Sequence, residues 1–354
     1  MQSEQKNPSN AGQTLPNLGI TQNVQTRHAL SQFFFDLATV PRAFFKEAAF
    51  RMNHLPLVNF QLAQQLALDG RMRDAILRYR LSLWMAPDHH LSWYFLGTSY
   101  LSLGERDKAL AAFARAYKLA PQHEETRFMI ATINPAILPE SKRPRSMPTS
   151  IATDYFDRLA PDYDRSQAAR GYRAHIAAEA SLREWLEPRR VNHSLLDIGC
   201  GTGAMGAMLA PYCEHIVGVD LARGMLALAN ERRRDNQSRI YSSAIQQDLR
   251  LFLPDISQPC DIITAVHVFN YVGDLSHVFE HVANALTVGG LFLFQIEPMT
   301  GEGYAMLPTA SRFGHSEHYI QSQLKGLPLT ILKQEMIQAY PDITMQQYIL
   351  RKTA

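Results

Sequence analysis

The chain has 354 residues, of which 46% are hydrophobic and 19% charged, with a formal net charge of +2. This composition is that of a soluble globular protein with room for two domains. The nearly balanced charge argues against a nucleic-acid partner, because binding to phosphate backbones rests on a basic surface. Three cysteines without CxxC spacing indicate neither a disulfide framework nor a metal site, so we expect a reduced, cytoplasmic protein.

The N-terminal region changes in composition near residue 25. Residues 1–24 are rich in Gln, Asn, Ser and Pro, lack the features of a signal peptide, and are predicted to be disordered. An aromatic-rich segment follows over Arg27–Asn53, which Pro41 should divide into two helices. We interpret it as packing on the next helices, with a membrane-surface helix as the disfavoured alternative, since its polar face is not strongly basic. No apolar run approaches the roughly 20 residues that span a bilayer.

A repeat occupies the region from about residue 56 to 123. Four positions, Gly70, Ala75, Tyr79 and Pro87, recur 34 residues later as Gly104, Ala109, Phe113 and Pro121. The second copy, residues 90–123, resembles a tetratricopeptide repeat, with Trp93, Leu96, Gly97, Tyr100, Ala109, Phe113, Ala116 and Pro121 at the motif positions. The first copy, residues 56–89, is weaker, with Asn59 in place of the tryptophan. A partial third copy, "ETRFMIATI", predicts a capping helix, so we expect one helical domain over residues 25–138.

A basic, Pro/Ser-rich segment, Pro139–Ser150, is interpreted as a linker to a second domain over residues 151–354. In that domain, apolar strand patterns alternate with amphipathic helix patterns, which predicts an α/β fold with a doubly wound, mostly parallel sheet. The tail, "LTILKQEMI" and "TMQQYILRK", predicts two further strands joined by a turn.

The first strand of this domain runs into "LLDIGCGTGAMG", Leu195–Gly206. A glycine turn between a strand and a helix leaves backbone N–H groups free to bind a nucleotide-like ligand. The spacing of Gly201, Gly203 and Gly206, with Asp220 some 20 residues on, fits a dinucleotide in an NAD-dependent oxidoreductase.

Three features favour S-adenosylmethionine over a dinucleotide. An acid, Asp197, already stands on the strand, where it suits an ammonium group and would repel a pyrophosphate. A further acid, Asp248, follows the third strand. The chain also ends in a predicted strand pair rather than in a second nucleotide-binding half.

These motifs resemble the class I S-adenosylmethionine-dependent methyltransferases, in particular the bacterial group in which tetratricopeptide repeats precede such a domain. The resemblance covers about residues 55–352 and rests on "DIGCGTG", "VGVDLARGMLALA", "YFDRLAPDYDRSQAARGYRAH" and "SRFGHSEHYI". It implies a Rossmann-like, seven-stranded, mostly parallel sheet and S-adenosylmethionine as the cofactor.

The resemblance also implies roles for single residues. Gly199, Cys200, Gly201 and Gly203 would form the loop under the methionine moiety, and Asp197 would orient its amino group. Asp220 would accept both ribose hydroxyls, with helix capping as the alternative, and Asp248 would accept from the adenine amine or serve only as a surface cap. The remaining expected contacts come from Leu221, Met225, Leu249, Tyr163, Tyr172 and Arg173.

The fourth strand ends in "AVHVFNYVGDL", where ligands sit in this kind of sheet. His267 is a candidate general base, with contact to the cofactor or to a backbone carbonyl as the alternative. Tyr271 and Asn270 are further candidates for the reacting end of the pocket. Glu297, at the end of the fifth strand, is a candidate at its mouth. His315 and His318 are further candidates from the segment after that strand, with a loop or capping role as the favoured alternative for each.

The sequence leaves the methyl acceptor open. The place after the fourth strand reads "HVFN", not the tetrapeptide of amino-DNA methyltransferases, and Pro259-Cys260 opens that strand, at the wrong end for cytosine chemistry. A small-molecule acceptor is favoured. A protein docked on the repeats, or a scaffold without catalysis, is the alternative, and a homo-oligomer is left open.

Overall fold

The computed structural model describes residues 42–186, 192–307 and 311–354, with side chains from residue 54 onward. The expected disorder of residues 1–24 and the first helix predicted before Pro41 lie outside these ranges. The chain divides into two compact units, with the division between Pro87 and Asp88.

The first unit is a helix pair. Its helices are α2 (Arg42–Leu68) and α3 (Met72–Met85). Helix α2 joins the second part of the aromatic segment to the first helix of the first repeat, because Pro56 lies inside it without ending it. The rings of Phe60 and Tyr79 meet between the helices with centroids 6.0 Å apart. Gly70 closes the turn with a φ of +75°, a conformation that glycine adopts without steric cost.

The second unit begins with three helices, α4 (His90–Ser102), α5 (Arg106–Leu119) and α6 (Glu124–Ile133). They correspond to the predicted second repeat and its capping helix. Gly97 lets α4 and α5 approach, since a Cβ at this position would lie 2.6 Å from Cε1 of the Phe113 ring. The small residue at this position of the repeat therefore allows its two helices to pack closely.

The segment predicted as a linker is bonded to the α/β region. It contains the short helices η1 (Pro135–Ile137) and η2 (Glu140–Lys142). The Met147 N–H then donates to the Tyr271 carbonyl at 2.9 Å, and the Gly273 N–H donates to the Arg145 carbonyl at 2.8 Å. The domain limits 25–138 and 151–354 stay a prediction.

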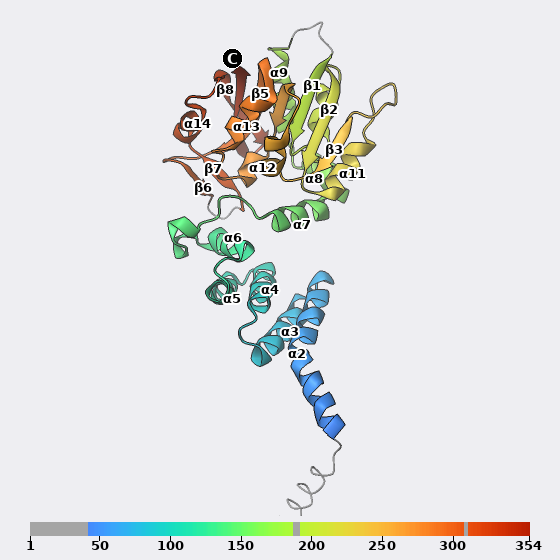
Figure 1. The fold of residues 1–354 in the computed structure, drawn as a ribbon, viewed down its shortest axis with the longest axis vertical. Coiled ribbons are helices and arrows are strands. Elements are labelled where there is room, and N and C mark those ends of the chain that lie inside the picture. The colour runs from blue at the N-terminus through green and yellow to red at the C-terminus, as the bar shows by residue number, and fades with distance from the viewer. Residues whose placement is uncertain (1–41, 187–191, 308–310) are drawn as a thin grey trace, which may run out of the picture. The chain divides into compact units, whose positions relative to one another are not determined.

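The α/β region is built on a mixed sheet. Its seven main strands lie in the order β3-β2-β1-β4-β5-β9-β8 (Figure 1). Strands β1 to β5 are parallel, and β9 is antiparallel to both β5 and β8. The strands are β1 (His193–Ile198), β2 (Cys213–Asp220), β3 (Ser243–Gln246), β4 (Cys260–Ala265), β5 (Leu286–Pro298), β8 (Leu329–Tyr340) and β9 (Ile343–Lys352). Two short strands, β6 (Tyr304–Met306) and β7 (Phe313–His315), form a hairpin that extends the end of β5 and was not predicted.

The sheet separates two apolar cores. Leu195 and Ile262 point to the core on one face, whereas their neighbours Leu196 and Ile263 point to the core on the other. This alternation follows from the two-residue period of a strand, and it explains why the strand sequences are continuously apolar. The expected Rossmann-like, doubly wound fold is confirmed.

Helices cover both faces of the sheet. The first face carries α9 (Ala174–Arg183), α10 (Ala204–Leu209) and α11 (Arg223–Glu231). The second carries α12 (Leu249–Phe252), η4 (Leu253–Asp255), η5 (Phe269–Tyr271), α13 (Val278–Ala285) and α14 (Glu317–Leu324). The segment that precedes α9, here called the lead-in segment, forms α7 (Thr149–Leu159), η3 (Ala160–Asp162) and α8 (Tyr163–Ala169).

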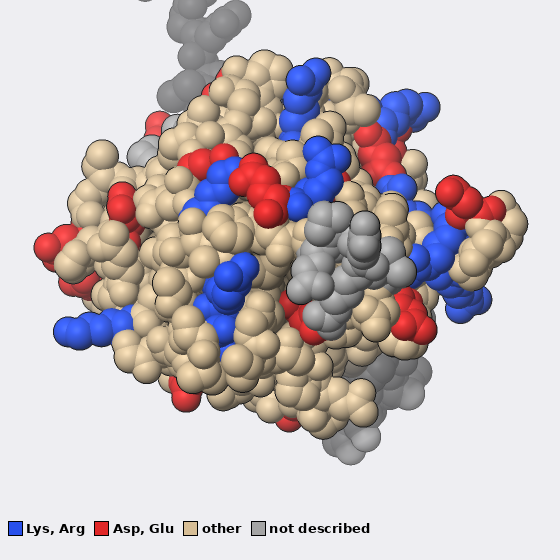
Figure 2. Space-filling model, turned by 90° about the horizontal axis from the view of Figure 1, so that it is seen from above, with Lys and Arg blue, Asp and Glu red and all other residues tan. Residues whose placement is uncertain are grey.

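Charges of both signs are interspersed on the face of the molecule seen in Figure 2, in keeping with the small net charge. None of the helices described is long and apolar enough to cross a bilayer. In the same residues, no three His, Cys, Asp or Glu side chains gather where they could hold a metal ion.

Candidate functional site

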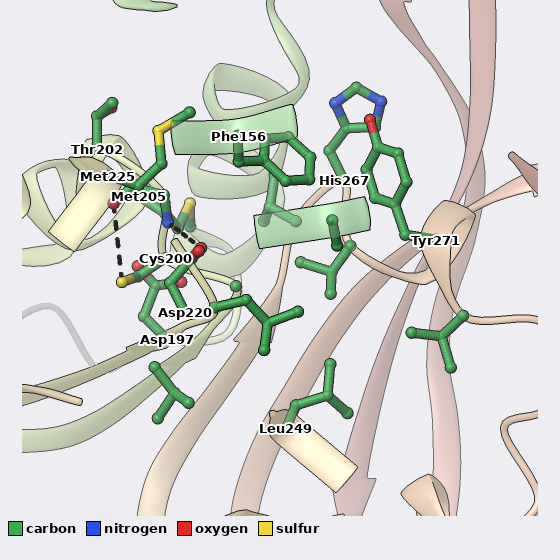
Figure 3. A pocket seen from close by; sticks show the side chains of 18 of the residues that line it. Phe156, Asp197, Cys200, Thr202, Met205, Asp220, Met225, Leu249, His267 and Tyr271 are labelled. Carbon is green, nitrogen blue, oxygen red and sulfur yellow. Dashed lines mark hydrogen bonds between the residues drawn. The ribbon is translucent and has the colours of Figure 1, made fainter. Parts of the chain in front are cut away.

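A pocket opens at the carboxyl ends of the parallel strands, where ligands bind in open α/β sheets (Figure 3). The loop after β1 supplies its glycines and the ends of β2 and β3 supply acids. The segment after β4 supplies His267 and Tyr271. The structure thus brings together most of the residues predicted from the sequence: Asp197, Gly199, Cys200, Gly201, Asp220, Leu221, Met225, Asp248, Leu249, Tyr163, Tyr172, His267 and Tyr271.

The loop after β1 is held in a backbone conformation that requires glycine. Gly199 has a φ of +62°, and a Cβ there would lie 2.4 Å from Cγ2 of Val268. Cys200 between the glycines is buried, and its N–H donates to the Val219 carbonyl at 3.1 Å. Burial raises the pKa of its thiol, so Cys200 packs as a neutral side chain.

Tyr241 explains two of the glycines in the dinucleotide-like pattern. A Cβ at Gly203 would lie 2.7 Å from the Tyr241 ring, and one at Gly206 would lie 2.3 Å from its hydroxyl oxygen. These glycines therefore make room for a buried tyrosine behind the loop, and Gly203 is not in the pocket wall. The antiparallel β9 between β5 and β8 also differs from the all-parallel dinucleotide fold.

Asp197 is fully buried at the end of β1 and already accepts two hydrogen bonds. Tyr241 Oη donates to its Oδ2 at 2.7 Å, and Thr264 Oγ1 donates to its Oδ1 at 2.8 Å. Burial raises the pKa of Asp197 to about 6, against the lowering effect of these bonds. A buried carboxylate of this kind gains strongly from a cationic ligand group.

Asp220 ends β2 and fastens the glycine loop to helix α11. Its Oδ2 accepts from the Gly201 N–H and its Oδ1 from the Ala222 N–H, both at 2.9 Å. The Leu221 N–H also bonds to this carboxylate, and burial raises its pKa against the effect of the three backbone bonds. A carboxylate has about four acceptor sites, so these bonds do not use all of them. Both predicted readings, capping and ligand binding, are compatible with this geometry.

Asp248 caps helix α12, the alternative weighed for it in the sequence. Its Oδ1 accepts from the Arg250 N–H at 2.9 Å, and its Oδ2 lies 2.5 Å from the Arg250 guanidinium. Thr149 Oγ1 also donates to it, at 3.1 Å. Burial raises the pKa of Asp248, but the bonds and charge of Arg250 outweigh it and hold that pKa below its usual value. Its predicted adenine contact stays a prediction.

The lead-in helices form one wall of the pocket. Phe156 of α7, Tyr163 of α8 and Tyr172 before α9 line it. Arg173, also predicted here, is exposed and lies outside the pocket wall. Its N–H is bonded to the Ala339 carbonyl of β8 at 2.8 Å.

Hydrogen bonds and an ion pair connect helix α8 to the glycine loop. Thr202 Oγ1 donates to Asp164 Oδ1 at 2.6 Å, and the Arg232 guanidinium lies 2.7 Å from Asp164 Oδ2. Arg232 Nε also donates to the Thr202 carbonyl at 2.5 Å. These residues could not be predicted from the sequence, because nothing in their spacing marks them as neighbours.

The opposite end of the pocket is aromatic. The His267 ring stacks on Tyr172 with centroids 5.4 Å apart and lies 6.4 Å from the Tyr271 ring. His267 has a φ of +60°, which is uncommon outside glycine and is found mainly where the surrounding structure imposes it. Burial and then the charges of Arg312 and Arg170 lower its pKa to about 4, so the ring is neutral at pH 7.

The other predicted residues near this end have mainly structural surroundings. His315 Nε2 donates toward the Val272 and Gly273 carbonyls at 3.0 and 2.9 Å and so holds the loop after β4. Glu297 Oε1 lies 2.5 Å from Arg312 Nε. Asn270 is buried in η5, and His318 is exposed on α14.

The helical region reaches the pocket through packing. Phe128 of α6 is buried in one cluster with Met147 and Ala152, which both line the pocket, and with Phe313 of β7. Ser150 Oγ also donates to Glu125 Oε1 at 2.6 Å. Helix α6 therefore supports the pocket wall, which the repeat pattern alone does not indicate.

The comparisons with known proteins agree with this geometry. Residues 196–292 match the family model "Methyltransferase domain", and residues 90–123 match "Tetratricopeptide repeat". The probable S-adenosylmethionine-dependent methyltransferase CRG1 of Saccharomyces cerevisiae is 31% identical over 145 residues, 39% of this chain and 48% of that protein. The malonyl-[acyl-carrier protein] O-methyltransferase of Bacillus anthracis is 27% identical over 173 residues, 48% of this chain and 60% of that protein. The chain thus spans about half the length of the curated relatives it matches.

Among solved structures, magnesium protoporphyrin IX methyltransferase from Synechocystis PCC 6803 with bound SAM has 16% identity and a TM-score of 0.47, covering 58% of this chain and 97% of that one. The sheet order, the pocket and the two family models define the class. The chain contains a class I S-adenosylmethionine-dependent methyltransferase domain, preceded by a tetratricopeptide repeat.

Proposed function

We propose that this protein transfers the methyl group of S-adenosylmethionine to a small-molecule acceptor by in-line displacement at the sulfonium methyl. The observation that carries the proposal is one pocket with two unlike ends. One end has a glycine loop, the buried acid Asp197 and the half-buried acid Asp220, and the other has aromatic rings around His267. The similarity to two known methyltransferases supports the reaction class.

The residues present fit the cofactor. Asp197 would bind an ammonium group through acceptor capacity left beside its bonds from Tyr241, Thr264 and the Gly206 N–H. Asp220 would bind the ribose hydroxyls through the capacity left beside its three backbone bonds. When bound, S-adenosylmethionine supplies a methyl group already activated by positive sulfur. The protein then has to hold the acceptor in line and exclude water, a task suited to the walls formed by Phe156, Tyr163 and Tyr172.

We propose His267 as a neutral positioning group rather than a general base. Its pKa of about 4 lies well below neutral pH, whereas an efficient base has a pKa near the working pH. Tyr271, whose pKa burial raises, would stay protonated and donate a hydrogen bond.

Calorimetric titration tests the cofactor assignment. We expect S-adenosylhomocysteine to bind the full chain with micromolar affinity, and NADH not to bind. Binding of NADH alone would overturn the assignment in favour of an oxidoreductase, and binding of neither would favour a scaffold role.

A labelled-methyl assay tests the acceptor size. The full chain is incubated with labelled S-adenosylmethionine and a cell extract, and the products are separated by ultrafiltration. We expect label in the small-molecule fraction, and label confined to proteins would favour docking of a protein substrate on the repeats. Removal of residues 1–145 would not be a suitable test of the role of the repeats. It would also remove Phe128, which packs with Met147 and Ala152 of the pocket wall.

A further inference from the structure

The segment that joins the helical region to helix α7 is bonded to the loop after β4. In this connecting segment, residues 145–149, the Met147 N–H donates to the Tyr271 carbonyl at 2.9 Å. Its neighbour Ser146 forms an antiparallel bridge with Val272. Because Met147, Tyr271 and Val272 all line the pocket, the connecting segment is part of the pocket wall.

The same segment is bonded to the loop after β3. Arg250 Nη1 donates to Ser146 Oγ at 2.6 Å, and Thr149 Oγ1 donates to Asp248 Oδ2 at 3.1 Å. Strands β3 and β4 are not neighbours, since β2 and β1 lie between them in the sheet. A segment bonded to both loops therefore passes along the edge at which β2 and β1 end, and this edge carries Asp220 and the glycine loop.

Helix α6 supports the connecting segment from outside the pocket. Phe128 of α6 has 1% of its surface exposed and is packed in one cluster with Met147. The cluster also includes Leu221 and Tyr271, which line the pocket, whereas Phe128 itself is not in the pocket wall. Phe128 can therefore affect a bound ligand only through the residues on which it packs.

The repeat in turn holds helix α6. Ile130 and Ala131 of α6 are buried in the cluster that contains Phe113 of α5. At its first turn, Glu125 Oε1 accepts from Ser150 Oγ of α7 at 2.6 Å. Close-packed interiors transmit a change of side-chain volume to their neighbours, so the position of α6 bears on the connecting segment and on the pocket.

We propose that Phe128 is a positioning residue for the cofactor site and acts through Met147, so that the repeat of residues 90–123 helps to build this site through α6. This inference rests on the proposed function. Coupling between two regions is reciprocal, so a ligand in the pocket stabilises α6 to the same extent as α6 favours binding of the ligand.

Two matched substitutions in the full chain test the proposal. Phe128→Leu and Phe113→Leu each reduce a buried phenylalanine of the helical region, but the cluster of Phe113 contains no residue of the pocket wall. We expect Phe128→Leu to bind S-adenosylhomocysteine about fivefold or more weakly than the unaltered chain, and Phe113→Leu to stay within about twofold of it. Calorimetry measures the affinities, and urea unfolding shows how far each variant is destabilised.

A double substitution tests whether Phe128 acts through Met147. Met147→Ala removes the side chain that would carry the effect. Adding Phe128→Leu to it should then cause no further loss of affinity for S-adenosylhomocysteine. Losses that add in the double variant would overturn the proposal.

Hydrogen exchange on the unaltered chain gives a readout without any substitution. Saturation with S-adenosylhomocysteine should slow exchange of the backbone amides of α6 more than that of the amides of α5. Unchanged exchange in α6, equal losses of affinity in the two single variants, or no loss in Phe128→Leu would each overturn the proposal. Failure of S-adenosylhomocysteine to bind the unaltered chain would instead overturn the proposed function, and this inference with it.

Discussion

The two ends of the pocket differ in how far the protein satisfies its own polar groups. At the glycine-loop end, Asp197 accepts from Tyr241 and Thr264, and Asp220 accepts from two backbone N–H groups. At the aromatic end, His267 has no hydrogen-bond partner among the described side chains. The first end is preorganised before any ligand arrives, as a site for a constant cofactor should be. Under the proposed function, a ligand bound at the second end would supply partners for the His267 ring nitrogens, which suits an acceptor that must enter and leave.

The largest effect is expected from Gly199→Ala. The new Cβ would lie 2.4 Å from Val268 Cγ2 at a φ of +62°, so the loop must move. We expect affinity for S-adenosylhomocysteine to fall by about 100-fold or more and stability by about 2–4 kcal/mol. Gly201→Ala is the control for stability: it has a φ of +54° but no atom within 4 Å of the new Cβ, and should cost only about 1 kcal/mol. Urea unfolding measures the stability of both variants and calorimetry the affinity of Gly199→Ala, and equal losses of stability would contradict the steric explanation.

Asp220→Ala should have the next largest effect. It leaves the Gly201 and Ala222 N–H groups without their acceptor, at about 1–3 kcal/mol each, and removes the proposed ribose contact. We expect S-adenosylhomocysteine binding to weaken at least tenfold in calorimetry. Asp248→Ala is the matched acid, whose bonds go mainly to the exposed Arg250, and should weaken binding less. A larger loss of affinity in Asp248→Ala than in Asp220→Ala would contradict the proposed importance of Asp220 for cofactor binding.

Asp197 predicts a pH dependence of cofactor binding. The free protein keeps this carboxyl protonated below its pKa of about 6, whereas the ammonium of the ligand favours the ionised form. Binding below pH 6 therefore expels a proton, and affinity for S-adenosylhomocysteine should fall by up to about tenfold per pH unit there and stay flat above. Titrations from pH 5 to 8 measure this, and Asp197→Asn should abolish the slope. A slope that persists in the variant would assign the proton to another group.

The smallest effect on the cofactor is expected from His267→Asn. Asparagine tolerates the φ of +60° better than other non-glycine residues, so the backbone should stay in place. We expect affinity for S-adenosylhomocysteine to change by less than about twofold, because His267 belongs to the acceptor end. A tenfold loss would show that the two ends are not separate.

The local motifs made much of the fold and half of the site predictable. The strand pattern and "DIGCGTG" place Asp197 on one strand and the glycine loop directly after it. The motif "VGVD" places Asp220 at the end of the next strand. Parallel strands bring those ends to one edge, so the residues meet whatever the details of packing. The structure brings these residues to one pocket, while their individual roles stay predictions.

Other features could not be read from spacing, because they depend on contacts between distant segments. Tyr241 reaches Asp197 from 44 residues away, and Arg232 reaches Asp164 from 68. The hairpin of β6 and β7 lies in a segment without a strong strand pattern, and it forms by pairing with the end of β5.

The sequence by itself determined the class of domain, the glycine loop and the helical repeat, since each depends on residues close together in the chain. Only the tertiary structure decided the state of the charges: which acids are satisfied, that burial and two arginines hold His267 neutral, and that Arg170 stands without an ion-pair partner among the described residues. Burial and electrostatic interactions depend on distance in space, and a linear pattern carries no measure of that distance.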